Sequence, residues 1–235
     1  MTKKSLFMFL IFSVVFSGAV ALANGAGTVS SSTYQYFTIQ PGPQDGKDST
    51  IYQTLDDLNF GDWEAMEVTR SDFDESRGLI QFDLPQLPAG ATLIRATMDL
   101  YMFNSGLQSQ QTHKLAVNSL SGSWGEMDVT WINQPGFYYD NEVHQYVTQD
   151  GWQSLDITPL VQNWITNPDS NNGLLVRSYF AGDQVLMDFR SSDFISDSAL
   201  RPKLTLKMNV VPEPISFLLF GLGGAVIAVR RKMKK

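Results

Sequence analysis

Carboxylates and aromatic rings are the main side chains able to do chemistry in this 235-residue sequence, because cysteine is absent and histidine is rare. The two histidines, His113 and His144, fit no zinc-ligand spacing, and we expect both at the surface. No Gly-x-Ser-x-Gly motif of a serine hydrolase occurs. Twenty-four Asp and Glu residues leave some pair at glycosidase spacing by chance alone. We identify no catalytic residue and predict that the protein is not an enzyme; a glycosidase or polysaccharide lyase is the alternative.

Two acidic stretches supply the hard oxygen ligands that calcium prefers. They contain Asp45, Asp48, Asp56, Asp57 and Asn59 in segments that resemble loops. Their spacing does not match an EF-hand, and acidic loops are commonly ordinary turns. A structural calcium ion is therefore one hypothesis for these residues, and simple turns are the other; no other cofactor is expected.

Aromatic rings could stack on the apolar faces of sugars. We expect Trp124, Trp131 and Trp164 to be mainly buried. The candidate glycan-binding aromatics are Trp63, Tyr101, Tyr138, Tyr139 and Trp152. Packing at the edges of the fold is the alternative for each of them.

The charge of the chain limits its partners. Residues 24–210 contain 10 Lys and Arg against 23 Asp and Glu, a difference of −13, whereas the whole chain has −7. This acidity excludes nucleic-acid binding through phosphate contacts. An acidic polysaccharide would need a local basic cluster, for which Arg77 and Arg95 are the candidates, or bridging calcium.

Alternating apolar and polar residues predict strands through most of the middle of the chain. Ile94, Ala96, Met98, Leu100 and Met102 fall on one face of a predicted strand. Further strands are predicted over residues 80–84, 115–117, 143–147, 155–157, 174–176, 185–189 and 204–208.

One short helix interrupts the strands at residues 159–166, with Thr158 as its N-cap and Pro159 at the first helical position. The predicted fold is therefore an all-β, antiparallel β-sandwich with one short helix. Its expected core includes Ile80, Phe82, Met98, Leu100 and Trp164.

The first 23 residues have the layout of a secretory signal peptide. A basic start precedes an apolar run over residues 6–20, and Ala21-Leu22-Ala23 is a small-x-small cleavage pattern. Signal peptidase is thus an expected partner, and an uncleaved N-terminal anchor is the alternative. Residues 24–44 are predicted to be a flexible lead-in to a domain over residues 45–210.

The C-terminal end also has three parts in order. Val211-Pro212-Glu213-Pro214 precedes an apolar stretch over residues 215–229, and a basic end follows that includes Arg230 and Arg231. This pattern resembles the PEP-CTERM sorting signal. The resemblance implies recognition by an exosortase, transient insertion in the inner membrane, and export in Gram-negative bacteria that make extracellular polysaccharide. An anchor with a transmembrane helix that is never cut is the alternative.

The middle of the chain resembles the DNRLRE domain. The matching segments, in order, are residues 77–84, 87–92, 96–101, 122–126, 129–135, 156–161, 172–175 and 201–204. Asp48, Asn59 and Gly61 match an Asp and an Asn-x-Gly motif near the start, whereas residues 188–193 are a degenerate form of the motif that names the family. The resemblance implies a jelly-roll-like sandwich, some relatives of which are carbohydrate-binding modules.

These observations predict an exported, exosortase-sorted protein of the cell surface or biofilm matrix that binds extracellular polysaccharide without cleaving it. A purely structural or adhesive surface protein is the main alternative.

Overall fold

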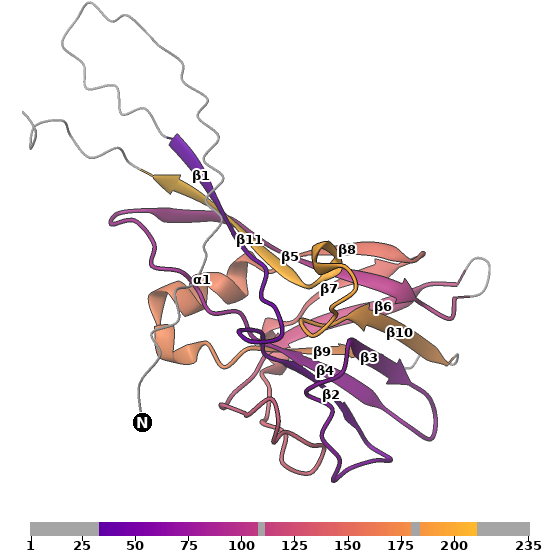
Figure 1. Ribbon diagram of the computed structural model, residues 1–235. Helices are drawn as coiled ribbons and strands as arrows, with labels where there is room; N and C mark the ends of the chain where they lie inside the picture. Colours follow the sequence, from indigo (N-terminus) through magenta and orange to yellow (C-terminus); the bar gives the residue numbers. More distant parts are fainter. Residues whose placement is uncertain (1–32, 108–110, 180–183, 211–235) are drawn as a thin grey trace, which may run out of the picture.

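The computed structural model describes residues 33–107, 111–179 and 184–210, which form two antiparallel sheets packed face to face (Figure 1). The six-stranded sheet contains β1 (Thr33–Ile39), β3 (Ala65–Arg70), β5 (Thr92–Asn104), β8 (Gly151–Asp156), β10 (Val185–Arg190) and β11 (Lys203–Val210). Its order is β1-β11-β5-β10-β3, with β8 also paired to β5. The five-stranded sheet, in the order β2-β4-β9-β6-β7, contains β2 (Asp48–Tyr52), β4 (Ser76–Ile80), β6 (His113–Ser119), β7 (Val143–Val147) and β9 (Leu174–Ser178).

The main core lies between the two sheets, because one side of most strands is apolar and faces the opposite sheet. The five side chains predicted as core from the sequence are each at most 1% exposed. The prediction of an all-β sandwich is therefore confirmed.

A β-bulge changes the alternation at the start of β5. Lys207 pairs with Arg95, but its neighbour Met208 pairs with Leu93, so Ile94 is the extra residue. Ile94 is consequently 46% exposed and Leu93 packs against the core instead. The prediction that Ile94 shares the core face of this strand is wrong, because the sequence pattern does not reveal the bulge.

The strand predicted over residues 80–84 ends at Ile80. Beyond it, side chains replace strand partners: the Asn171 amide donates to the Phe82 carbonyl at 2.9 Å, and Gln81 donates to the Asn171 carbonyl at 2.7 Å. Phe82 is still fully buried. The alternation of apolar and polar residues therefore predicted correctly that Phe82 is buried. It predicted wrongly that the strand continues beyond Ile80.

The sandwich begins earlier than the sequence suggested. Residues 33–39 of the predicted flexible lead-in form β1, which pairs along its whole length with β11. Phe37 of this strand is buried in the core. The lead-in prediction is wrong for these residues, because a single buried ring in a polar strand is a weak sequence signal.

The predicted short helix is present as α1 (Thr158–Thr166), at one end of the sandwich in Figure 1. It buries Leu160, Val161 and Trp164. Its N-cap differs from the prediction: Thr158 is already helical, and the Asp156 carboxylate accepts the Thr158 backbone N–H at 3.1 Å.

A long connection between β6 and β7 covers the outer face of the five-stranded sheet. Leu120 and Val129 of this connection form a second core cluster with Ile51, Leu79 and Leu175 of the sheet. Three half-buried aromatic side chains pack against this second cluster, namely Trp124, Trp131 and Phe137. The connection ends in a short 3-10 helix, η1 (Tyr139–Asn141), which leads into β7.

Both predicted sorting segments, residues 1–23 and residues 211–235 with Val211-Pro212-Glu213-Pro214, lie outside the described residues. Within the described ranges, no helix combines the length and apolarity needed to cross a membrane.

The assigned register of β5, with Leu100 in the core and Ile94 in the bulge, can be tested by mutation. We expect Leu100→Ala to lower the free energy of unfolding of the full-length chain by about 2–5 kcal/mol, because it opens a cavity between the sheets. Ile94→Ala on the same strand is the control and should cost at most about 1 kcal/mol. Urea unfolding followed by tryptophan fluorescence measures both, and equal losses would contradict the assigned register.

Candidate functional site

The register of the five-stranded sheet aligns two arginines on its outer face. Gly78 of β4 pairs with Val176 of β9, so the next residues, Arg77 and Arg177, lie opposite each other on adjacent strands. Arg177 in turn pairs with Ala116 of β6. Two like charges in facing positions are destabilising unless other groups compensate them.

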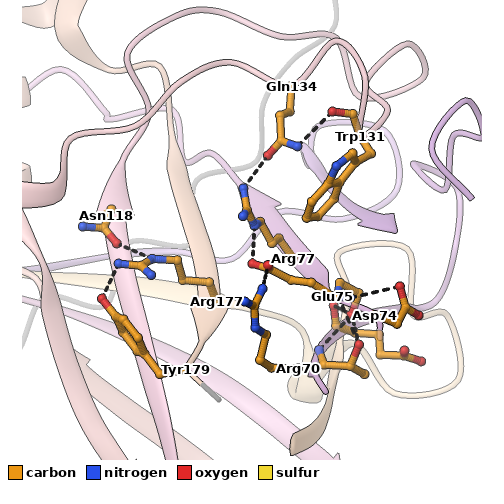
Figure 2. Close-up of polar contacts among 12 residues, drawn as sticks. Arg70, Asp74, Glu75, Arg77, Asn118, Trp131, Gln134, Arg177 and Tyr179 are labelled. Atoms are coloured by element: carbon orange, nitrogen blue, oxygen red, sulfur yellow. Dashed lines mark hydrogen bonds and ion pairs between the residues drawn. The ribbon is translucent and has the colours of Figure 1, made fainter. Parts of the chain in front are cut away.

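Arg77 is compensated by a carboxylate and by the β6–β7 connection (Figure 2). Glu75 lies between two guanidinium groups: its Oε1 is 2.6 Å from Arg77 Nε, and it also forms an ion pair with Arg70. Arg77 Nη1 donates to Gln134 Oε1 at 2.9 Å, and its guanidinium lies 4.5 Å from the centre of the Trp131 ring. Arg77 therefore fixes the middle of the connection to the sheet.

Arg177 is 8% exposed and lies among aromatic rings. Its guanidinium is 4.4 Å from the centre of the Tyr179 ring, 5.1 Å from Phe137 and 5.7 Å from Tyr139. Arg177 Nε donates to Asn118 Oδ1 at 3.0 Å, and Nη2 donates to the Tyr179 hydroxyl (Figure 2). These contacts set the positions of the rings at the end of the connection.

Glu142, just before β7, joins the basic groups of this face. Its carboxylate accepts from Lys114 Nζ at 2.8 Å and from Arg177 Nη2 at 2.9 Å, and it lies 3.2 Å from His144 Nδ1. Burial opposes ionisation of this carboxyl, but hydrogen bonds from Lys114 and Tyr179 and the charge of Arg177 hold its pKa below its ordinary value. Glu142 is thus a fixed anion at neutral pH.

Three tyrosine rings are exposed around Lys114 and Arg177. Tyr139 is 73% exposed, Tyr146 66% and Tyr179 36%. Lys114 pairs with Tyr146 across β6 and β7, and its ammonium lies 4.2 Å from the centre of the Tyr179 ring. We call Lys114, Tyr139, Tyr146, Arg177 and Tyr179 the tyrosine–lysine patch.

A cavity of about 340 Å³ lies beside this patch, between η1 and the first turns of α1. Asp140, Asn141, Glu142 and Asn163 give its lining a polar character. Glu142 therefore faces both the cavity and the patch. The arrangement offers ring faces for stacking, cations for anionic groups, and amide and carboxylate groups for hydroxyls.

Three of the predicted glycan-binding residues lie at this face. Arg77 lies beneath the connection, and the Tyr138 and Tyr139 rings are exposed at its end. The sequence reasoning missed Lys114, Tyr146, Arg177 and Tyr179, although three of them alternate with apolar residues in β6, β7 and β9.

The other predicted residues lie elsewhere. Trp63 packs against Phe60, with ring centres 4.5 Å apart. Tyr101, Trp152 and Arg95 belong to the six-stranded sheet, and Arg95 pairs with Asp156 at 3.0 Å. Arg77 and Arg95 therefore do not form the predicted basic cluster, because they lie on different sheets.

The prediction that both histidines lie at the surface is correct for His144 and wrong for His113. His144 is on the surface, with 44% of its side chain exposed. His113 is 3% exposed, because it faces the core side at the start of β6, where its ring contacts the Ser105 carbonyl at 3.1 Å.

Two of the predicted calcium ligands, Asp45 and Asn59, already have protein partners. Asp45 accepts the Gly42 backbone N–H at 2.7 Å, and the Asn59 amide donates to the carbonyls of Glu126 and Val129. Among residues 33–107, 111–179 and 184–210, no three His, Asp or Glu side chains form a group suited to a metal ion. Asp56 and Asp57 are exposed in their loop. Calcium binding stays a prediction.

Asp48 has a different role from the one predicted. It is 3% exposed, and its Oδ2 accepts the Ser192 backbone N–H at 2.9 Å, which joins β2 to the loop after β10. Burial raises the pKa of this carboxyl to about 7.

Two family models match the chain. Carbohydrate-binding module family 96 matches residues 43–207, and the PEP-CTERM protein-sorting motif matches residues 210–232. No curated protein matches the chain significantly.

The raised pKa of Asp48 predicts a dependence of stability on pH. Because the folded-state pKa of about 7 lies above the unfolded value, the folded state binds the proton more tightly. Its contribution to stability should therefore fall as pH rises from about 4 to 7, by on the order of 1.4 kcal/mol per pH unit, and then level off. Asp48→Asn keeps the acceptor for Ser192 and removes the titration.

Urea unfolding of both proteins across this pH range measures the effect. Wild type should lose stability relative to Asp48→Asn as pH rises. Parallel profiles would contradict the assigned burial of a titrating carboxyl.

Proposed function

The chain belongs to carbohydrate-binding module family 96, and on that premise we propose that the tyrosine–lysine patch binds an acidic polysaccharide outside the cell. The family suggests carbohydrate binding, and the PEP-CTERM motif indicates exosortase-dependent sorting to the surface of a Gram-negative bacterium. The ligand class and the binding residues are what the proposal adds.

The observation that carries the proposal is the grouping of three exposed tyrosines around Lys114 and Arg177. Tyr139, Tyr146 and Tyr179 come from separate parts of the chain and gather on one open face. A tyrosine ring offers an apolar face to a pyranose and a hydroxyl to its rim. Contacts with Arg177 hold two of these rings in place, so little conformational entropy is lost on binding.

The charge of this face supports an acidic ligand. Arg77, Lys114 and Arg177 share two carboxylates, those of Glu75 and Glu142, and Arg70 of the six-stranded sheet also pairs with Glu75. With Asp140 counted, this face is close to neutral, which contrasts with the difference of −13 over residues 24–210. Sugar carboxylates would be repelled less here than over most of the surface, and Lys114 gives them a cationic contact.

The state of Glu142 argues against glycoside cleavage at this face. A glycosidase needs one carboxyl group that is protonated at working pH. Glu142 is held as an anion by Lys114 and Arg177. We therefore propose binding without catalysis, with calcium, if bound, in a structural role.

The proposed route to the surface has two processing steps. Signal peptidase would cut after Ala23, and exosortase would act at the motif that contains Pro212, Glu213 and Pro214. Between these steps the C-terminal segment would hold the protein in the inner membrane.

A binding experiment with matched variants tests the function. The full-length chain, purified in mild detergent, is titrated calorimetrically with neutral and acidic oligosaccharides, with and without EDTA. Tyr146→Ala and Lys114→Gln should each weaken acidic-glycan binding roughly three- to tenfold, because each removes one stacking or charge contact. Phe73→Ala is the control, because Phe73 is 91% exposed and is not one of the patch residues.

Raising the salt from about 0.05 to about 0.5 M should weaken binding of the wild type and leave Lys114→Gln less affected. Binding to no glycan would favour the purely adhesive role. New reducing or unsaturated ends would establish an enzyme, and binding that both patch variants leave unchanged would refute the assigned site.

A further inference from the structure

A second set of rings and lysines lies on the outer face of the six-stranded sheet, on the opposite side of the sandwich from the tyrosine–lysine patch. Tyr34 and Tyr36 of β1 are 50% and 55% exposed, and Trp152 of β8 is 39% exposed. Each group of rings has a lysine above it. Lys207 Nζ lies 4.5 Å from the centre of the Tyr34 ring, and Lys203 Nζ lies 4.1 Å from Trp152.

The strand register places these rings at two ends of one surface. Tyr36 pairs with Lys207, and Lys207 pairs with Arg95 of β5; Trp152 pairs with Tyr101, further along β5. From standard strand dimensions the two groups are about 20 Å apart along the strands and about 14 Å apart across them.

A row of threonine hydroxyl groups crosses the surface between the rings. Thr38, Thr205 and Thr97 form one row across β1, β11 and β5, because each pairs with the next. Their small side chains leave room for a flat ligand, and their hydroxyls can donate to or accept from its polar groups.

Two of the carboxylates on this surface are already engaged. Asp156 pairs with Arg95 at 3.0 Å, and Asp99 accepts a hydrogen bond from Ser154. Within the part of the chain that the structure describes, neither Lys203 nor Lys207 forms a salt bridge. The ammonium group of each lies over the face of an aromatic ring. An anionic ligand would therefore find two lysines that form no salt bridge, although Asp99 lies opposite Lys203 on the adjacent strand.

We propose that this face, with Tyr34, Tyr36, Trp152, Lys203 and Lys207, is a second binding site for acidic polysaccharide. The proposal rests on the proposed function of the first face. A sugar chain would stack on the rings at both ends, place its carboxylates near the two lysines, and cross the threonine row.

Two sites on opposite faces of one sandwich have a structural consequence. The outer side chains of the two sheets point in opposite directions, so the two faces would bind two different chains, or distant parts of one long chain. The protein would then cross-link polysaccharide, as expected for a matrix component.

The stoichiometry of binding tests the proposal. The full-length chain in mild detergent is titrated with a short acidic oligosaccharide. Wild type and the control Phe73→Ala should bind two oligosaccharides per chain. The double variant Tyr36→Thr, Trp152→Thr should bind one, because both changes keep residues that favour strands while removing the rings. The double variant Lys114→Gln, Tyr146→Ala should also bind one.

Cross-linking provides a second measurement. With a long acidic polysaccharide, wild type should raise light scattering strongly, whereas either double variant should bind the polymer with little rise. Circular dichroism confirms that each variant is folded.

The outcomes separate the two proposals. If wild type binds no oligosaccharide, the proposed function and this inference both fail. If wild type binds one per chain and the Tyr36, Trp152 variant also binds one with unchanged affinity, the first site stands and the second is refuted. If that variant keeps glycan binding and instead loses binding to phosphatidylglycerol vesicles, the face contacts membrane and the inference is wrong.

Discussion

Arg177 is the residue on which the proposed binding face depends. It lies opposite Arg77 on adjacent strands, an arrangement that would repel if nothing else were present. Glu75 and Glu142 each take up two or more of the basic groups, and the rings of the β6–β7 connection cover both guanidiniums. The groups that compensate Arg77 and Arg177 therefore also hold the β6–β7 connection in place across the five-stranded sheet. The same contacts hold the Tyr139 and Tyr179 rings, so the structural and binding roles of this face have one cause.

The distribution of charge explains how an acidic domain can bind an acidic polymer. Seven of the ten basic residues between positions 24 and 210 lie on the outer faces of the two sheets, namely Arg77, Arg95, Lys114, Arg177, Arg190, Lys203 and Lys207. Many acidic residues lie in the connections, including Asp56, Asp57, Asp62 and Asp128. Because salt screens charges beyond about 8 Å at physiological ionic strength, the local charge of each face matters more than the total.

The sequence predicted the sheet faces better than the details that position the site. Met98 and Leu100 were identified as core because their alternation is regular, whereas Ile94 was misplaced because a bulge depends on the partner strand. Tyr138 and Tyr139 were found because they follow turn residues. Arg177 could not be identified from the sequence. Its role in positioning the rings depends on contacts with three other segments, which only the fold brings together. Arg77 and Arg95 are close in sequence, yet the chain places them on different sheets.

A structure of the chain with a bound acidic oligosaccharide is the most direct test of the central claim. The account predicts sugar rings over Tyr146, Tyr179 or Tyr139, with a sugar carboxylate within hydrogen-bonding distance of Lys114. It also predicts that Arg177 keeps its contacts with Glu142 and Phe137, because those contacts prepare the face before the ligand arrives. A structure with no oligosaccharide on this face, and with oligosaccharide bound instead among the acidic loops near Asp48 and Asp193, would contradict the account.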